Sequence, residues 1–221
     1  MNSAQEGRTP SKRGRSKRLE ILVAATDRFG WDGYEHTKWA DIAGDIGVGA
    51  TALYHYFESK QHCLYEIMDE AIEDFRSQFV AITAAEPDLR RAIGTVMASC
   101  FELTEHDVLR NRVLVAEQGR LSVPSTSVRE EQARQAARSR MRELEFAWAS
   151  FLATAMRDGV IPDTDPRLLT RAVLGLYNSI WHWYRPNGLI ALDRIAEYYT
   201  QLALAVVGLP PEATVPERVA A

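Results

Sequence analysis

The chain has 221 residues, of which 46% are hydrophobic and 25% charged, and its formal net charge is -4. This length and composition allow one large domain or two small ones with a sizeable core. No apolar run approaches the ~20 residues of a transmembrane helix, and none follows the basic N-terminus, so we expect neither a membrane span nor a secretory signal.

Charge is unevenly distributed along the chain. Six basic residues and no acidic residue lie between Arg8 and Arg18, and all four lysines fall within the first sixty residues. A basic front end on an acidic body indicates that only the front end meets a polyanion. The two cysteines, Cys63 and Cys100, lack the spacing of a metal site, so we expect buried thiols in a reduced, cytoplasmic protein.

Almost the whole chain has helical periodicity. Apolar residues recur at spacings of three, four and seven, and Pro or Gly separates the periodic segments. Ser59 and Asp165-Pro166 are typical helix starts, whereas Gly47 ends a helix. We find no internal repeat and no long strand-period segment, so we predict an all-α fold with about nine helices. They are expected at residues 19–29, 38–46, 50–56, 60–79, 87–104, 106–121, 127–157, 166–184 and 192–207.

Two short helices joined by the turn Gly47-Val48-Gly49 predict a helix-turn-helix. In this motif the exposed face of the second helix enters the DNA major groove. That face carries Thr51, which can contact a base edge, and Tyr54 and His55, which can bind phosphate oxygens. Lys60, at the start of the next helix, can bind phosphate together with backbone N–H groups. The alternative is that the aromatic rings of this segment only pack in the core.

Residues 33–60 carry a longer pattern, G-Y-E-H-T-K-W-A-D-I-A-G-D-I-G-V-G-A-T-A-L-Y-H-Y-F-E-S-K. This stretch resembles the DNA-binding domain of TetR-family transcriptional regulators. The matching positions are Gly33, Tyr34, Thr37, Asp41, Ile42, Ala43, Gly47, Val48, Leu53, Tyr54, Tyr56, Phe57, Ser59 and Lys60. The resemblance implies an all-α homodimer with an N-terminal DNA-binding unit and a C-terminal unit for ligand binding and dimerisation.

The resemblance also implies domain boundaries and DNA contacts. We expect a disordered basic arm at residues 1–14, a helix-turn-helix domain at 15–62, a ligand-binding and dimerisation domain at 63–209 and a disordered tail at 210–221. The basic arm could enter a minor groove or lie along phosphates, or be a solvated tail without specificity. The residues expected to contact DNA are Thr37, Lys38, Trp39, Ala50, Thr51, Tyr54, His55, Tyr56 and Lys60.

Three positions depart from the family pattern. Lys38 stands where a capping Ser or Thr is usual, so Thr37 can cap the helix instead, and Lys38 or Trp39 can reach the DNA backbone. Gly49 and Thr51 replace the usual Ser or Thr and the usual Gly. Gly49 is a tolerable N-cap, whereas Thr51 puts a side chain where the family has close backbone approach. These departures concern the docking detail and the operator sequence rather than DNA binding itself.

The C-terminal part has enough large apolar side chains for a ligand pocket between helices. One helical face near residues 148–155 is the first candidate for its wall. The expected lining residues are Met97, Phe101, Trp148, Phe151, Leu152, Ala155, Tyr177 and Trp181. The alternative for any one of them is ordinary core.

The block W-Y-R-P-N-G at residues 183–188 resembles the W-Y-R-P-G-G segment of a TetR branch whose effectors are acyl-CoA thioesters. Arginines in and just before the long helix at 127–157 could bind CoA phosphates by charge-assisted hydrogen bonds. These arginines are Arg120, Arg129, Arg134, Arg138, Arg140 and Arg142. The alternative is a solvated face on which they pair with neighbouring glutamates.

The sequence and the resemblance therefore predict a repressor, with an activator as the alternative, that binds a near-palindromic operator of double-stranded DNA as a homodimer. The last two helices would form the dimer interface, and a small hydrophobic effector, with an acyl-CoA thioester as the candidate, would release the DNA. None of the five histidines has Glu or Asp three residues earlier, and no phosphate loop or nucleophile elbow occurs, so we expect no enzyme, cofactor or metal site. The alternative is a helical small-molecule-binding protein or enzyme without sequence-specific DNA binding.

Overall fold

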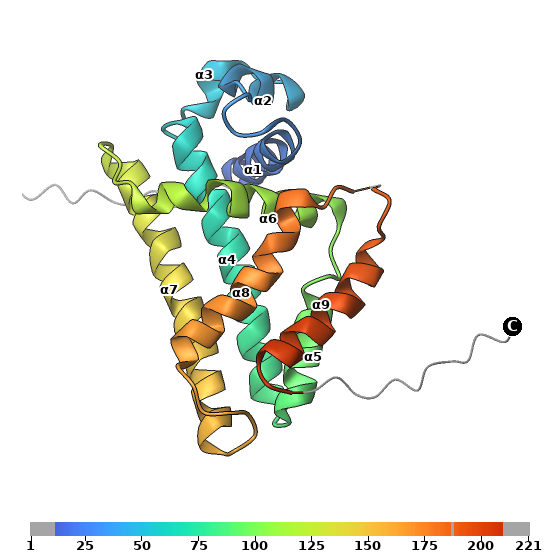
Figure 1. The fold of residues 1–221 in the computed structure, drawn as a ribbon. Coiled ribbons are helices and arrows are strands. Elements are labelled where there is room, and N and C mark those ends of the chain that lie inside the picture. Colours follow the sequence, from blue (N-terminus) through green and yellow to red (C-terminus); the bar gives the residue numbers. More distant parts are fainter. Residues whose placement is uncertain (1–11, 187, 210–221) are drawn as a thin grey trace, which may run out of the picture.

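The computed structural model describes residues 12–186 and 188–209 (Figure 1). Within these ranges the chain forms nine α-helices and one 3₁₀ helix, without strands, which confirms the predicted fold class. The helices are α1 (Lys12–Asp32), α2 (Trp39–Asp45), α3 (Ala50–Leu53), α4 (Lys60–Ala85), α5 (Leu89–Ser99), α6 (Glu105–Glu117), η1 (Gln118–Ser122), α7 (Val128–Arg157), α8 (Pro166–Trp183) and α9 (Leu192–Val206).

Parts of the predicted arm, loop and tail lie outside the described residues. These are residues 1–11 of the arm, Asn187 of the W-Y-R-P-N-G block and the whole tail at 210–221. The last three residues of the expected arm, 12–14, belong to α1. None of the helices in the described ranges is long and apolar enough to cross a membrane.

Side-chain caps set most helix starts. The Ser59 hydroxyl accepts a hydrogen bond from the His62 N–H at 3.0 Å, as predicted, and the Asp165 carboxylate accepts from two N–H groups of α8. The helix expected at 87–104 ends earlier, at Ser99. The reason is a capping box, in which Thr104 accepts from the Asp107 N–H and the Asp107 carboxylate accepts from the Thr104 N–H, so Thr104 starts α6.

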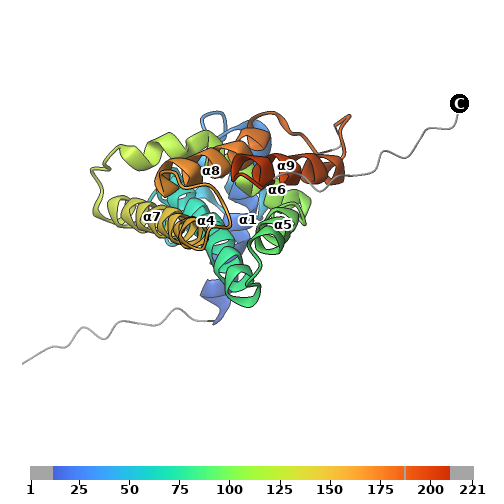
Figure 2. The same ribbon diagram turned by 60° about the horizontal axis from the view of Figure 1, so that its bottom comes forward.

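The helices form an upper unit, α1–α3, set on a larger bundle, α4–α9 (Figure 1). α4 descends from the upper unit and packs along α7, while α6 lies across the bundle between α1 and α8. A Cβ at Gly30 of α1 would lie 2.6 Å from the Leu109 Cβ of α6, so this close approach requires glycine. Figure 2 shows α8 and α9 side by side as one outer layer of the bundle.

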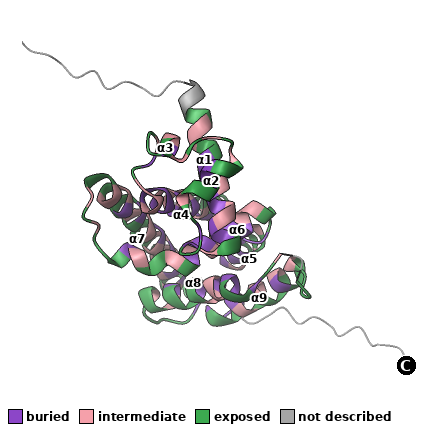
Figure 3. Cartoon of the chain, turned by 90° about the horizontal axis from the view of Figure 1, so that it is seen from above, coloured by how far each residue is buried: buried purple, intermediate pink, exposed green. Residues whose placement is uncertain are grey.

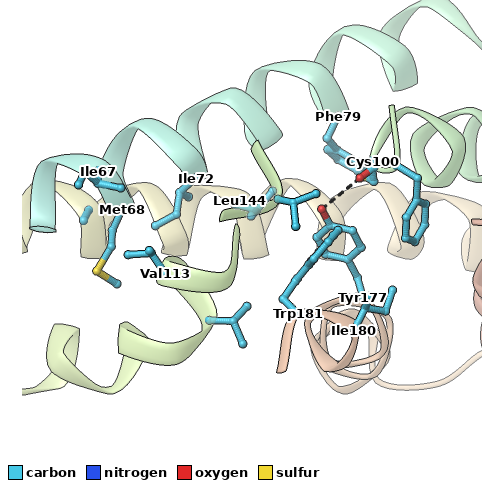
Figure 4. Packing of buried hydrophobic residues seen from close by; sticks show 14 of the residues in the cluster. Ile67, Met68, Ile72, Phe79, Cys100, Val113, Leu144, Tyr177, Ile180 and Trp181 are labelled. Carbon is cyan, nitrogen blue, oxygen red and sulfur yellow. Dashed lines mark hydrogen bonds between the residues drawn. The ribbon is translucent and has the colours of Figure 1, made fainter. Parts of the chain in front are cut away.

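One continuous core extends through both units, and Figure 4 shows a part of it within the bundle. Trp148 of α7 is 1% exposed, and its ring stacks on Phe79 of α4 with the centroids 4.3 Å apart. The Tyr177 hydroxyl donates a hydrogen bond to the Cys100 carbonyl oxygen at 3.3 Å. Cys63 and Cys100 are free and buried, as expected, and burial raises the pKa of both thiols.

Candidate DNA-binding surface and ligand cleft

The helix-turn-helix has its own small core within the upper unit. Ile42 of α2, Leu53 of α3 and Phe57 are completely buried. Gly47 turns the chain with a φ of +65°, which an L side chain adopts only with strain. Gly49 then occupies the N-cap position of α3 without a side-chain bond, as the sequence suggested. α3 itself is shorter than predicted, because only turns continue it from Tyr54 to Tyr56.

Four of the nine expected DNA-contacting residues are exposed on this unit: Lys38, Thr51, Tyr54 and His55. Tyr54 is 55% exposed, and within the described chain its hydroxyl has no hydrogen-bond partner. Its ring packs edge-on against Trp39 at a centroid distance of 6.4 Å. Three others are half-buried and pack against the core, so only part of each is accessible to DNA; these are Trp39, Ala50 and Tyr56.

Thr37 and Lys60 have structural contacts that the sequence analysis did not anticipate. Thr37 is buried, and its hydroxyl donates to the carbonyl oxygens of Gly33 at 2.9 Å and Arg28 at 3.3 Å. Thr37 therefore does not cap α2. Lys38 occupies the N-cap position, and the backbone N–H of Lys38 donates a hydrogen bond to the Asp41 carboxylate.

The Lys60 ammonium group binds the segment between α1 and α2. It donates to the carbonyl oxygens of Tyr34 at 2.7 Å and Thr37 at 2.9 Å, and lies 4.1 Å from the centroid of the Tyr34 ring. Burial lowers the pKa of this ammonium group. The side chain that was expected on a phosphate is thus engaged in holding the segment between α1 and α2.

The expected pocket residues are core residues. All eight belong to the buried cluster or pack against it, and Met97, Trp148, Leu152 and Trp181 are at most 2% exposed. Tyr177 also lines a small cavity between the helices of the bundle. A different face of α7, at residues 138–145, lines the cleft between η1, α7 and α8.

A cleft of about 510 Å³ opens between η1, α7 and α8. It is lined by Gln118, Leu121, Ser122, Arg138, Met141, Arg142, Glu145, Arg171, Leu174, Gly175 and Asn178. A cavity of about 40 Å³ continues inward and shares Gln118, Met141, Leu174 and Asn178 with the cleft. Its other walls are mainly apolar and include Ile72, Phe75, Leu114, Leu144 and Tyr177. The site therefore has a polar mouth and an apolar inner end.

The arginines near the cleft divide into paired and unpaired groups. Arg140 binds Asp69 and Glu73 of α4, and Arg134 is buried with Glu131, whose pKa its guanidinium lowers to about 2. The guanidinium groups at the mouth have no ion-pair partner in the part of the chain that the structure describes. These are Arg138, Arg142 and Arg171. Three guanidinium groups against one carboxylate, that of Glu145, give the lining of the cleft a net positive charge, which suits an anionic group.

Sequence reasoning missed most of the α8 wall. Arg171, Leu174, Gly175 and Asn178 follow one another at helical spacing, which places them on one face of α8. That periodicity was present in the sequence, but it did not distinguish a cleft wall from a surface or a dimer contact.

Two family descriptions match this chain. Residues 21–67 match "Bacterial regulatory proteins, tetR family", and residues 109–207 match "Tetracyclin repressor-like, C-terminal domain". The HTH-type transcriptional repressor KstR2 of Mycolicibacterium smegmatis is 30% identical over 200 residues, which cover 89% of this chain and 92% of that protein. The chain belongs to the TetR family. The KstR2 repressor of Mycobacterium tuberculosis H37Rv is also 30% identical, over 205 residues that cover 89% and 94% of the two chains.

Solved structures agree with this TetR-family assignment. PfmR from Thermus thermophilus has a TM-score of 0.71 at 26% identity, covering 86% of this chain and 98% of PfmR. AibR, solved with isovaleryl coenzyme A and operator DNA, has a TM-score of 0.71 at 19% identity, covering 88% and 99%. The latter likeness, below 25% identity, concerns the fold alone.

Membership of the TetR family makes the chain a ligand-responsive, DNA-binding transcriptional regulator. The N-terminal match at 21–67 spans most of α1, all of α2 and α3, and the first two turns of α4. It therefore includes Lys38, Thr51, Tyr54 and His55, the exposed residues of the helix-turn-helix. The C-terminal match at 109–207 includes the arginine-lined mouth of the cleft.

Proposed function

We propose that this TetR-family regulator is a repressor that binds a near-palindromic operator as a homodimer and is released by an acyl-CoA thioester. The observation that carries the effector class is the cleft, which has an apolar inner end and, at its mouth, three arginines without an ion-pair partner among the described residues. An acyl-CoA has the same two parts, an anionic phosphate-bearing half and an apolar acyl half. Guanidinium groups bind phosphates by charge-assisted, often bidentate hydrogen bonds.

Arg138 and Arg142 lie one helical turn apart on α7, and Arg171 faces them from α8. In this arrangement the three side chains would hold the CoA phosphates while the acyl group points inward. The inner cavity of about 40 Å³ is smaller than any acyl chain, so Met141 and Leu174, which line both spaces, must move aside. That displacement gives the effector different affinities for two states of the protein, as release of DNA requires.

The comparisons support this effector class without naming the acyl group. AibR, a structural relative, was solved with isovaleryl coenzyme A and operator DNA. The solved structure of KstR2 from M. tuberculosis is described as that of a ketosteroid transcriptional regulator. In the structural comparison it has a TM-score of 0.70 at 22% identity and covers 91% of this chain. Short, long and steroid acyl-CoAs are therefore the ligands to compare.

The outer layer formed by α8 and α9 supports dimerisation. Figure 3 shows from above that exposed and half-buried residues follow one another along both helices. Several of the exposed residues have large apolar side chains, which a second copy of the chain would cover. They are Leu168 (62% exposed), Trp183 (46%), Tyr198 (64%) and Val206 (41%). Two such helices from each subunit would form a four-helix interface about a two-fold axis.

A two-fold dimer would present two recognition helices to two half-sites about 34–36 Å apart, or a multiple of that distance. In vitro selection from random duplex DNA tests this part of the proposal. We expect enrichment of one near-palindromic sequence that is bound by a dimer. Weak binding without any enriched sequence would contradict it.

Tyr54→Phe tests the assignment of α3 to the DNA surface. We expect operator affinity to fall about tenfold, because the hydroxyl would lose a hydrogen bond to a charged phosphate worth about 1.5 kcal/mol. Fluorescence anisotropy with the selected duplex measures this change. Thermal unfolding should stay the same, since the hydroxyl has no partner within the described chain. Unchanged operator affinity would remove Tyr54 from the DNA contacts.

Lys38→Met and Lys60→Met form a matched pair that separates DNA contact from structure. Lys38→Met should leave stability within about 0.5 kcal/mol and reduce the slope of log affinity against log salt by about 1, because one phosphate contact is lost. Lys60→Met should lower the free energy of unfolding by about 1–3 kcal/mol, because it leaves two loop carbonyls without their donor. Urea unfolding and salt titrations of DNA binding measure both. If Lys38→Met lowered stability and Lys60→Met reduced the salt slope instead, Lys60 would be the phosphate contact and Lys38 the structural residue.

A further inference from the structure

The Arg120 side chain joins the mouth of the cleft to the DNA-binding unit. Arg120 lies on η1, three residues of which (Gln118, Leu121 and Ser122) line the cleft. In a 3₁₀ helix, residues three apart share a face, so Gln118 and Leu121 point to one side and Arg120 to another. The short η1 helix thus has one face on the cleft and one on the segment between α1 and α2.

Arg120 binds that segment in two ways. Its guanidinium pairs with the Glu35 carboxylate and lies 4.6 Å from the centroid of the Tyr34 ring. On its own side it pairs with Glu117 at 2.5 Å, at the end of α6. Tyr34 is buried, and its carbonyl oxygen accepts from Lys60. A displacement of Arg120 would therefore move or release Tyr34 and Glu35, in the loop that leads into α2.

The main chain of η1 has anchors that do not involve the Arg120 side chain. The buried Arg134 donates to the Leu121 carbonyl oxygen, and the Tyr65 hydroxyl donates to the Arg120 carbonyl oxygen at 3.5 Å. A separate contact, between the Glu130 carboxylate on α7 and the Ser59 hydroxyl at the N-cap of α4, also joins the bundle to the DNA-binding unit. Loss of the Arg120 side chain should therefore neither unfold η1 nor detach the two units.

We propose that Arg120 is the positioning residue that transmits occupancy of the cleft from η1 to the segment between α1 and α2. This rests on the proposed effector site, because a ligand at the mouth must displace or contact Gln118 and Leu121. The displaced η1 then pulls on Tyr34 and Glu35 through Arg120 and re-orients α2 and α3. The coupling acts beside α4, the helix that links the two units covalently. A partly exposed ion pair adds little stability, so the role of this contact is coupling rather than folding.

The test compares the wild type with Arg120→Met, which keeps an unbranched apolar side chain but removes the charge. Arg129→Met is the control, because Arg129 lies exposed on α7 and does not line the cleft. Palmitoyl-CoA and a steroid acyl-CoA serve as probes. Calorimetry measures probe binding to the free proteins, and anisotropy measures operator affinity with and without probe. The release factor is the ratio of these two operator affinities.

We expect all three proteins to bind operator and probe with affinities within about threefold of one another, and Arg120→Met to show a release factor about tenfold smaller. Hydrogen exchange at residues 34–38 should rise on probe binding in the wild type and the control but not in Arg120→Met. Equal release factors in all three proteins would overturn the role of Arg120 and leave the proposed function standing. If neither probe binds the wild type, the proposed effector class fails, and the role of Arg120 fails with it.

Discussion

Arg138→Glu combined with Arg142→Glu should weaken acyl-CoA binding by about 100-fold or more. Each arginine would lose a charge-assisted hydrogen bond to phosphate worth about 1.5–3 kcal/mol, and each glutamate adds repulsion. Neither arginine has an ion-pair partner in the described residues, so their replacement breaks no internal contact of that kind. Calorimetric titration of the free protein measures the change.

Arg129→Glu is the control for this experiment, since it makes the same charge change on the same helix outside the cleft. Effector affinity should stay within about twofold of the wild type in that variant, with screening by salt reducing any long-range effect. Operator binding by Arg138→Glu/Arg142→Glu without effector should remain normal. If the double variant bound the acyl-CoA as tightly as the wild type, the mouth of the cleft would not be the CoA site.

Trp148→Ala should lower the free energy of unfolding by about 3–5 kcal/mol. The ring is 1% exposed and stacks on Phe79, so truncation leaves a large cavity between α7 and α4. Urea unfolding, with the slope compared to that of the wild type, measures the loss.

Phe146→Ala, two residues away on α7, is the matched control. Phe146 is 74% exposed, so its loss should change stability by no more than about 0.5 kcal/mol.

The sequence analysis put Trp148 in the wall of the ligand pocket, and the structure puts it in the core. If Trp148→Ala changed effector affinity strongly and stability little, the pocket interpretation would be restored.

Helix positions could be predicted because their signals are local. A helix cap does not depend on the tertiary fold, since it needs only the next two or three backbone N–H groups. The starts of α4 at Ser59 and of α8 at Asp165-Pro166 are of this kind. The end of α5 was misplaced because two signals competed. The apolar pattern runs on past Ser99, but the capping box of Thr104 and Asp107 starts a new helix.

The ligand site could not be predicted in the same way, because pairing and cavity lining depend on distant residues. Arg140 and Arg142 look alike in sequence, yet Arg140 is paired with Asp69, 71 residues earlier, while Arg142 is not paired within the described chain. Lys60 was expected on a phosphate, and only the folded chain brings the Tyr34 carbonyl to its ammonium group. The large rings of Trp148 and Tyr177 are expected in the core, where both lie, but the sequence does not show that Tyr177 also lines a cavity.

The most direct test of the whole account is a titration of acyl-CoA into the complex of the protein with its selected operator. Anisotropy of labelled duplex would follow release, with short, long and steroid acyl-CoAs compared against free CoA and the free acids. We expect at least one thioester to release the DNA, with operator affinity falling about 5- to 150-fold. Free CoA and free acid should each be far weaker, because each fills only one half of the cleft. An operator affinity that stays constant with every thioester, although calorimetry shows that the thioester binds, would contradict effector-driven release.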